Sequence, residues 1–431
     1  MNIFLGVYAC EPNNGSEPEV GWQMVSEIAK AMPNDHIYAV TKLNNKEVIE
    51  KEGYDKNINF FYYAPPKWLT FWKKGGRGIR TYYYIWLIGA ALFMKKQNIK
   101  FDIVHHITFV NDWLPSFFFL LKNKNNKFIW GPIGSHDPIE SKFLDGSKRK
   151  NIEKVRIFLQ LFFRNLDPFF HICKAKADCI IGINDNVRKK LNLKDSKLFV
   201  SEPAIAMKKS VVEKIATKEK DTNSFTVITV GRLLYIKNFK LTIMSFAKFL
   251  ENNQNITNVK LQIIGEGGDR KSLVKLTKDL DIENFVEFTG NIPLHEVQNN
   301  FAKANLFLFP TLENAGFVTL EAMSNSLPVV AMKYGGPEQF IKHNVEEQLV
   351  SSTDCYEDIT NAISQKLQLF YDSAELCKKV GEQNRQDILD NFTWEAKAQK
   401  MKIIYIKENM YYNLLYEKER TNKANNKRFS S

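Results

Sequence analysis

Residues 310–338 read PTLENAGFVTLEAMSNSLPVVAMKYGGPE, and this stretch decides the fold. The short apolar run at 304–309, directly before it, predicts a buried strand. Within the stretch, residues 319–325 have the spacing of a helix, and residues 328–332 form a second apolar run that predicts another buried strand. The order of strand, loop, helix and strand indicates an α/β protein.

Two carboxylates in this stretch, Glu313 and Glu321, stand eight residues apart around Gly316. We expect Glu313 in the loop and Gly316 at the start of the helix, where backbone N–H groups lack partners and can receive a diphosphate or a sugar hydroxyl. Glu321, inside the helix, is expected to accept hydrogen bonds from ribose hydroxyls. The arrangement therefore predicts a site for a nucleotide sugar.

The segment resembles the motif of glutamate, seven residues and glutamate that is found in retaining glycosyltransferases of family 4, the glycosyl transferases group 1 with the GT-B fold. The strand predicted at 226–231, followed by Arg232 and Lys237, is similar to the family's pattern of strand, G-R, four residues and K. Three further segments fit the family in the same order: a strand and glycine turn at 260–268, V-E-F-T-G at 286–290, and the aromatic signal at 391–394 that opens the last helix. The resemblance covers roughly the C-terminal half of the chain.

The resemblance implies two Rossmann-like domains that face a cleft, with a C-terminal helix that returns to the first domain. The rhythm of strands and helices places an N-terminal domain at residues 1–203. The resemblance implies that this domain binds the acceptor and that the returning helix corresponds to residues 394–418. The nucleotide-sugar-binding domain is then expected at 204–393, and residues 419–431 are expected to form a frayed polar tail.

The N-terminal half supports the same fold. A strand predicted at 2–10 and a helix predicted at 20–32 flank a glycine-containing turn, and two more strands are predicted at 101–105 and 127–130. The last of these strands runs into the sequence G-P-I-G, and glycine lets a ligand approach the backbone closely. The candidate residues for an acceptor or phosphate loop are Gly15, Ser16, Gly131 and Gly134.

The chemistry assigned to the second domain does not use a metal. A departing nucleotide diphosphate develops negative charge, which fixed cations and backbone dipoles can stabilise. Arg232 and Lys237 follow a strand, so they are expected at the carboxyl edge of the sheet, where ligands of open α/β sheets bind. The predicted donor-binding residues are Arg232, Lys237, Glu313, Ala315, Gly316, Phe317 and Glu321. The alternative is a solvated turn with two surface acids.

Three residues are candidates for catalysis. Glu313 is assigned to the hydroxyls of the donor sugar. His105 ends the strand predicted at 101–105 and His136 follows the loop predicted at Gly131, so both histidines could face the cleft. Family members often carry a histidine after the strand that corresponds to 127–130, whereas this chain has Gly131 there. A structural histidine is therefore the alternative for His105 and for His136. No nucleophile is evident, and the resemblance implies a front-face reaction in which the leaving phosphate deprotonates the acceptor.

Composition limits the remaining possibilities. The chain has 431 residues with 44% apolar content, enough for two domains, and five scattered cysteines that suggest neither a disulfide framework nor a zinc site. We expect no metal or other cofactor, and the D-x-D sequence at 279–281 is interpreted as a helix end. The first residues resemble a strand without a basic leader, which predicts a cytoplasmic protein.

Two segments combine aromatic or apolar residues with basic ones, at 67–86 and 148–164. The apolar run at 82–94 is too short to span a bilayer. With a net charge of +12, such segments fit peripheral contact with an anionic membrane, at the inner face of the cytoplasmic membrane. The alternative is a pair of amphipathic core helices with solvated cationic faces.

The sequence thus predicts a retaining, metal-independent glycosyltransferase that moves a sugar from a nucleotide diphosphate sugar to a glycan or lipid-linked acceptor in cell-surface polysaccharide assembly (capsule, O-antigen or exopolysaccharide). An epimerase or phosphorylase of GT-B architecture is the alternative enzyme. A nucleic-acid-binding protein is favoured by charge alone, since no recognition module is present. A glycoside hydrolase would not need Arg232 and Lys237 beside the paired carboxylates. The base, the sugar, the acceptor and the linkage stay open.

Overall fold

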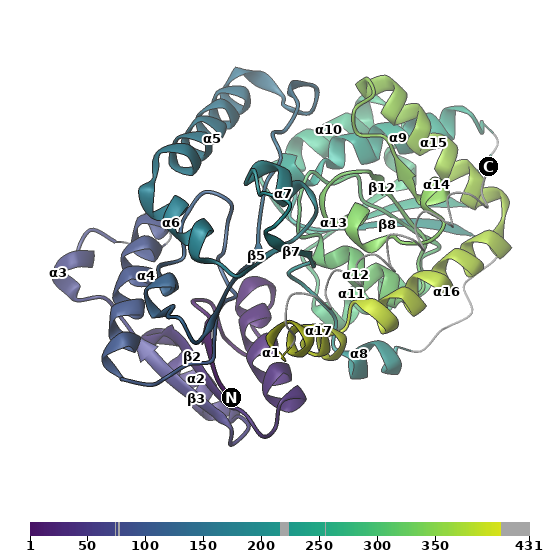
Figure 1. Cartoon of the computed structure of the whole chain (residues 1–431). Helices are drawn as coiled ribbons and strands as arrows, with labels where there is room; N and C mark the ends of the chain where they lie inside the picture. Colours follow the sequence, from purple (N-terminus) through teal and green to yellow (C-terminus); the bar gives the residue numbers. More distant parts are fainter. Residues whose placement is uncertain (74, 76–77, 216–223, 255, 407–431) are drawn as a thin grey trace. The chain divides into compact units, whose positions relative to one another are not determined.

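The computed structural model describes residues 1–73, 75, 78–215, 224–254 and 256–406, apart from the side chain of Ser16. Its contacts divide the chain into two units (Figure 1). The first contains residues 1–133, 167–202 and those from Glu395 onward, and the second contains residues 134–166 and 203–394. The predicted first domain included 134–166, which the contacts group with the second unit. The predicted tail at 419–431 and the end of the returning helix lie outside the described residues.

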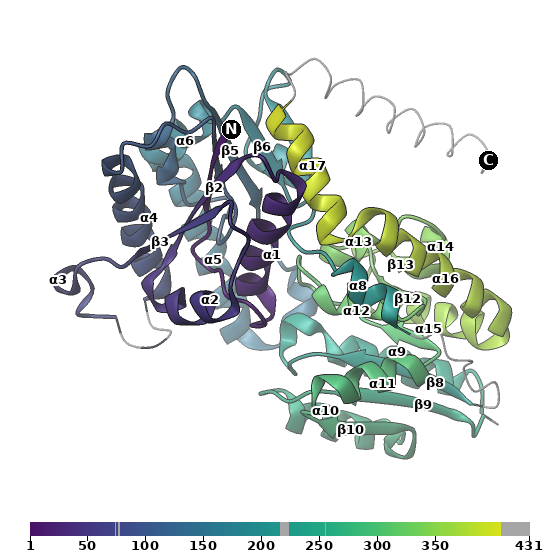
Figure 2. The same cartoon turned by 90° about the horizontal axis from the view of Figure 1, so that it is seen from below.

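The first unit is built on a parallel sheet of seven strands in the order β3-β2-β1-β4-β5-β6-β7. The strands are β1 (Asn2–Gly6), β2 (His36–Lys42), β3 (Ile58–Tyr63), β4 (Ile103–His106), β5 (Lys127–Ile133), β6 (Cys179–Gly182) and β7 (Leu198–Ser201). Helices cover both faces of the sheet (Figure 2). They are α1 (Ser16–Ala31), α2 (Lys46–Glu52), α3 (Lys67–Thr70), α4 (Ile79–Lys96), α6 (Pro168–Lys176), α7 (Asn186–Lys190) and α17 (Trp394–Ile406).

The second unit repeats this plan with six parallel strands in the order β10-β9-β8-β11-β12-β13. The strands are β8 (Phe225–Val230), β9 (Val259–Ile264), β10 (Val286–Gly290), β11 (Leu306–Leu308), β12 (Val329–Met332) and β13 (Leu349–Val350). The helices are α5 (Gly146–Leu166), α8 (Lys209–Lys214), α9 (Phe239–Glu251), α10 (Arg270–Asp279), α11 (Leu294–Lys303), α12 (Phe317–Ser324), α13 (Gly335–Phe340), α14 (Val345–Gln348), α15 (Tyr356–Asp372) and α16 (Ala374–Asn391).

The strand order places a switch point in each sheet. In the first unit, β1 lies between β2, the next strand in the chain, and β4, a later strand. In the second unit, β8 lies in the same way between β9 and β11. Loops that leave the carboxyl ends of these adjacent strands diverge, and this is where open α/β sheets bind ligands. In the second unit the loops in question follow β8 and β11.

Most of the predicted elements are confirmed, with shifts at their ends. The decisive stretch is β11, a loop, α12 and β12, and the strand predicted at 286–290 is β10. The helix predicted from Val20 begins earlier, at Ser16, and its first turn contains Glu17 and Glu19, acidic residues that are favourable at a helix N-terminus. The predicted loop at Gly131 was wrong. Gly131 and Pro132 continue strand β5, and both are buried.

A close approach between strands explains why glycine stands at position 131. Gly131 has φ 134°, and a Cβ atom there would lie 2.0 Å from the backbone oxygen of Ile181 in β6. A side chain would therefore force the two strands apart. This glycine serves sheet packing.

The described part of the last helix, α17, is fixed to the first unit by a buried ion pair. Lys397 Nζ lies 2.8 Å from Glu202 Oε1, and Lys400 Nζ lies 3.0 Å from Glu202 Oε2. Burial acts to raise the pKa of Glu202, but the two lysine charges outweigh it and hold that pKa below its usual value. The carboxylate therefore stays ionised and ties α17 to the end of β7.

Tyr405 forms a second attachment of α17, to His105. The Tyr405 hydroxyl and His105 Nδ1 are 2.7 Å apart, and both residues are buried. We expect Tyr405→Phe to lower the free energy of unfolding by about 1–2 kcal/mol, because the His105 nitrogen then has no buried donor. Urea denaturation measures this change. Tyr38→Phe is the control, since no hydrogen bond of the Tyr38 hydroxyl is found among the described residues. Equal effects of the two changes would contradict the role of this hydrogen bond.

Candidate functional site

The switch point of the second sheet brings together two loops that the sequence identified separately. β8 and β11 are adjacent parallel strands, so the loops that follow them leave the same edge. The Leu312 N–H donates to the Ile236 carbonyl at 2.8 Å, and the Asn238 side-chain amide donates to the Pro310 carbonyl at 3.1 Å. These bonds hold the loop that carries Lys237 against the loop that carries Glu313.

Lys237 and Glu313 form an ion pair in this arrangement. Lys237 Nζ lies 2.5 Å from Glu313 Oε2, and the side chains are 14% and 22% exposed. The lysine nitrogen also lies 5.2 Å from the centre of the Phe309 ring. Because both charges remain partly open to solvent, the pair presents one cationic and one anionic group at the carboxyl edge of the sheet. The structure thus brings together two of the predicted donor-binding residues.

Glycines shape the backbone around Glu313. Gly316 has φ 59° and Gly335 has φ 65°, both in the left-handed region that favours glycine. A Cβ atom at Gly335 would lie 2.1 Å from the Glu313 carbonyl oxygen, and one at Gly336 would lie 2.7 Å from the Ala315 carbonyl oxygen. The loop after β12 is thus packed directly beneath the loop after β11. No role for the Y-G-G-P segment at 334–337 was predicted from the sequence.

Helix α12 starts from this loop. Ala315 is exposed, Gly316 is buried and Phe317 is half-buried as the first residue of the helix. The first N–H groups of a helix have no partner within the helix and attract anions. Glu321, one helical turn further on, is partly exposed, and no partner for its carboxylate is found among the described residues. Burial raises the pKa of Glu321 to about 7.

Asn314 is a residue of this loop that sequence reasoning missed. It is 5% exposed, and neither its amide nitrogen nor its amide oxygen has a hydrogen-bond partner among the described residues. The buried Thr319 hydroxyl in α12 also has no hydrogen-bond partner among the described residues. Unpaired buried polar groups are costly, so their presence beside Glu313 marks the loop as a place where polar partners are to be expected. An asparagine inside the spacing between the two glutamates was the only signal in the sequence.

Arg232 lies at the same edge, after β8. It is exposed, and no ion pair of its side chain is found in the described parts of the chain. Its loop is bound to the loop after β9, since the Leu233 N–H donates to the Glu266 carbonyl at 2.9 Å. A Cβ atom at Gly267 would lie 2.4 Å from the Leu233 carbonyl oxygen, so glycine is needed for this approach. The guanidinium is thus carried by a fixed backbone and is available to an anion.

His105 in the first unit has a different character. It is fully buried, with Nδ1 bonded to Tyr405 and Nε2 lying 2.7 Å from the Gly131 carbonyl oxygen. Burial lowers its pKa to about 4, so the ring is neutral at pH 7. Nε2 then donates to the carbonyl and Nδ1 accepts from the tyrosine hydroxyl. Both ring nitrogens are occupied, which favours the structural alternative for His105.

The other predicted residues are dispersed. Gly15 is exposed directly before α1, Ser16 is the first residue of that helix, and the side chain of Ser16 lies outside the described atoms. Gly134 and His136 lie in the segment that the contacts assign to the second unit, with Gly134 half-buried and His136 exposed. Of the two loops predicted from the sequence, Gly15 and Ser16 thus lie at the start of α1, whereas Gly131 lies in β5.

The D-x-D sequence at 279–281 lies at a helix end, as predicted. Asp279 is the last residue of α10, and Asp281 follows in a turn with φ 56°. Over the described residues, no group of three or more histidine, cysteine, aspartate or glutamate side chains is placed to hold a metal ion.

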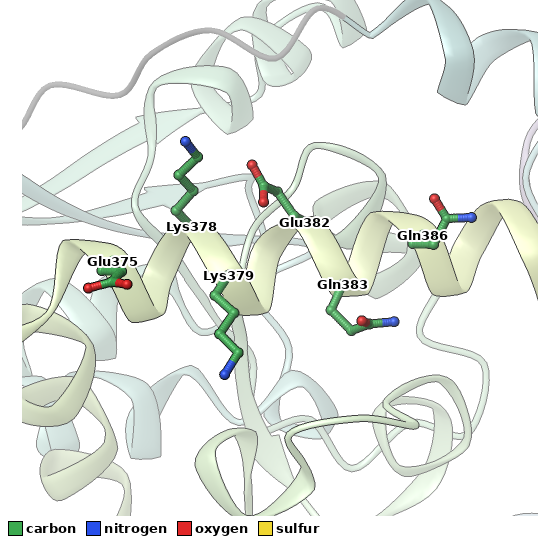
Figure 3. A pocket seen from close by; sticks show the side chains of 6 residues that line it. All are labelled: Glu375, Lys378, Lys379, Glu382, Gln383 and Gln386. Carbon is green, nitrogen blue, oxygen red and sulfur yellow. The ribbon is translucent and has the colours of Figure 1, made fainter.

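A shallow hollow along α16 is not part of the site. Figure 3 shows the six side chains that line it, and they leave successive turns of one helix in different directions. They are Glu375, Lys378, Lys379, Glu382, Gln383 and Gln386. Their spacing of three and four residues is that of an ordinary solvated helix surface.

Comparison with known proteins agrees with the geometry of the second unit. Residues 211–387 match the family model described as glycosyl transferases group 1. This segment is therefore similar to the group 1 glycosyltransferases. The matched segment contains Arg232, Lys237, Glu313 and Glu321, and it ends within α16.

Individual relatives and structures extend the comparison. The chain is 26% identical over 237 residues to the N-acetyl-alpha-D-glucosaminyl L-malate synthase of Bacillus anthracis, which is 55% of this chain and 56% of the relative. It is 26% identical over 183 residues to a GDP-mannose-dependent alpha-(1-6)-phosphatidylinositol monomannoside mannosyltransferase of Mycolicibacterium smegmatis, 41% of this chain and 46% of the relative. The chain thus spans about half the length of these relatives.

The fold is shared over a longer stretch. The structure of the sucrose-phosphate synthase from Thermosynechococcus elongatus matches with a TM-score of 0.60 at 17% identity, covering 94% of this chain and 98% of that chain. Together with the two parallel sheets, this likeness shows the α/β GT-B fold with two Rossmann-like units, as the sequence predicted.

Proposed function

We propose that the protein is a retaining, metal-independent glycosyltransferase that moves a sugar from a nucleotide diphosphate sugar to a glycan or a lipid-linked acceptor. The observation that carries this proposal is the Lys237–Glu313 pair at the switch point of the second sheet, beside the start of α12. A cation at this position can bind the pyrophosphate, and the carboxylate beside it can accept hydrogen bonds from sugar hydroxyls. The similarity of residues 211–387 to the group 1 glycosyltransferases supports the same assignment.

In this proposal the chain supplies charge and position. Lys237 and Arg232 stabilise the negative charge that develops on the diphosphate, and the first N–H groups of α12 add a dipole of the same sign. Glu313 binds donor-sugar hydroxyls together with the backbone around Ala315, and Glu321 binds the ribose. The bond from the anomeric carbon to the phosphate oxygen breaks, and a bond to the acceptor oxygen forms on the same face. The acceptor proton passes to the leaving phosphate.

The acceptor and the location are proposed from less specific observations. One relative is named for action on a phosphatidylinositol monomannoside, which supports a lipid-linked acceptor in cell-surface polysaccharide assembly. Across the described helices, none is both long and apolar enough to cross a membrane. We place the protein in the cytoplasm, with peripheral contact at the inner face of an anionic membrane.

Calorimetry with nucleotides tests the central assignment. We expect one of uridine, guanosine or adenosine diphosphate to bind well below millimolar concentration, in the presence of a chelator as well as without it. Incubation with the matching nucleotide sugar and membrane glycolipid extract should then yield a glycoside with retained configuration. An epimerised nucleotide sugar or a sugar phosphate as product would favour the alternative enzyme classes. Salt-sensitive DNA binding with no nucleotide affinity would overturn the proposal.

A further inference from the structure

Helix α5 (Gly146–Leu166) carries its apolar side chains on the outside. Val155 is 57% exposed, Phe158 is 65% exposed and Leu166 is 64% exposed, although apolar residues of an amphipathic helix usually face the core. The exposed apolar side chains are Ile152, Val155, Phe158, Leu159, Leu161, Phe162 and Leu166. Figure 1 shows α5 as one continuous helix. Five of these residues recur at intervals of three and four, so they form one stripe along the helix.

The polar side of α5 faces the second unit. Glu153 is buried and accepts from the Ile139 N–H at 2.8 Å and from Arg156 Nε at 2.8 Å. At the start of the helix, Arg149 Nη2 lies 2.7 Å from Asp269 Oδ1. These bonds fix which side of α5 is turned inward. Within the second unit the helix is therefore attached by its polar side, with its apolar stripe left to solvent.

This orientation decides between the alternatives left open by the sequence for residues 148–164. A core helix with a solvated cationic face would bury its phenylalanines, and α5 does the opposite. By contrast, α4, which begins within the segment at 67–86, buries Tyr83, Trp86 and Leu87. The exposed aromatic residues of that segment, Trp68 and Phe71, lie before α4. The exposed apolar side chains of α5 therefore need an explanation other than packing in the core.

The charges next to the stripe indicate its partner. Lys148, Lys150 and Lys154 are exposed, and the only acidic residue of α5 is the buried Glu153. A second copy of this helix would bring lysines against lysines or against apolar side chains, with no carboxylate to pair with them. An anionic surface accepts all three lysines, and each Lys near such a surface adds to the attraction. An apolar stripe beside lysines is the pattern of a helix that lies in a membrane interface.

We infer that α5 binds the surface of an anionic lipid bilayer, with the stripe from Ile152 to Leu166 inserted among the acyl chains and the lysines at the headgroups. The helix lies along the membrane plane. This inference deepens the peripheral contact proposed above, and it does not depend on the identity of the donor or the acceptor.

Co-sedimentation of the full chain with sucrose-loaded vesicles tests the inference. We expect binding to vesicles of phosphatidylglycerol and phosphatidylcholine, and much less to phosphatidylcholine alone. Phe158→Ser with Phe162→Ser should weaken binding to the anionic vesicles about tenfold to a hundredfold, because two large apolar groups no longer leave water. Changing Lys148, Lys150 and Lys154 to Gln should remove most of the preference for anionic lipid and its dependence on salt.

Two controls make the result specific. Val211→Ser with Leu294→Ser removes two exposed apolar residues of the second unit outside α5, and vesicle binding should not change. Trp68→Ser with Phe71→Ser measures any vesicle binding that is due to these two exposed aromatic residues of the first unit. The basic residues Lys74 and Arg77, close to them in the sequence, lie outside the described residues.

Unchanged vesicle binding by the α5 double variant would overturn the inference. A change from dimer to monomer in that variant, measured by sedimentation, would also overturn it, because the stripe would then be a contact between two copies of the chain. Nucleotide affinity, measured by calorimetry on the same variants, should stay the same. If no nucleotide binds to the original chain while the vesicle results hold, the proposed transferase function fails and the membrane surface stands.

Discussion

Lys237→Ala is expected to weaken nucleotide diphosphate binding about tenfold to a hundredfold and to lower the rate of sugar transfer about 100- to 1000-fold. The first loss follows because a hydrogen bond between charged groups contributes roughly 1.5–3 kcal/mol. The larger loss in rate follows because the charge on the diphosphate grows as the bond to the sugar breaks, so the transition state needs the cation more than the ground state does. Calorimetry and a product assay measure the two effects separately.

A nearby lysine provides the matched control. Lys240 is three residues away, has a 46% exposed side chain and pairs with Asp145 at 2.9 Å, away from Glu313. Lys240→Ala should leave both the affinity and the rate within about twofold of the original values, since exposed ion pairs contribute little. A Lys237→Ala protein that binds nucleotide as tightly as the Lys240→Ala protein would show that Lys237 does not bind the donor. Its fold is checked by circular dichroism, because Glu313 loses its partner.

The site in the second unit could be predicted from the sequence because its signals are local. A strand, a loop and a helix follow one another within about twenty residues around Glu313, and the pattern of apolar residues identifies each. The contact between Lys237 and Glu313 depends on the pairing of β8 with β11, which are far apart in the chain. The sequence indicated the partners through a family resemblance, and the strand order explains the contact.

Features that depend on what lies opposite a residue could not be predicted in this way. The G-P pair at Gly131 is typical of a loop, yet the close approach of Ile181 keeps it in a strand. Gly335 and Gly336 support the Glu313 loop through contacts that no local pattern encodes. In α5, periodicity reveals a polar and an apolar side, but only the bonds of Glu153 and Arg149 show which side faces the protein.

Glu321→Gln is expected to make the free protein more stable and the donor complex weaker, a combination that a purely structural glutamate would not give. Burial raises the pKa of Glu321 to about 7, whereas an unfolded chain has an ordinary glutamate pKa near 4.3. Between these values the folded protein keeps a proton that the unfolded chain releases, so stability falls as pH rises, and the full cost is present above about pH 7. Glutamine carries no charge and avoids this cost.

The expected gain is therefore confined to one side of the pH range. At pH 8 the variant should be more stable by on the order of 1–3 kcal/mol in urea denaturation, and at pH 4 the two proteins should be equal. Glu382→Gln, on the exposed surface of α16, is the control and should change stability little at either pH.

Donor binding should follow the same ionisation in the opposite sense. In the proposed donor complex the ionised Glu321 carboxylate would accept hydrogen bonds from two ribose hydroxyls, and the glutamine amide has only one oxygen to accept them. At pH 8 the variant should thus bind nucleotide about tenfold to a hundredfold more weakly than the original protein. As pH falls through 7 towards 5 the original protein takes up a proton, and its affinity should approach that of the variant. If the two affinities differ by the same factor at pH 5 and pH 8, the carboxylate charge is not what holds the ribose.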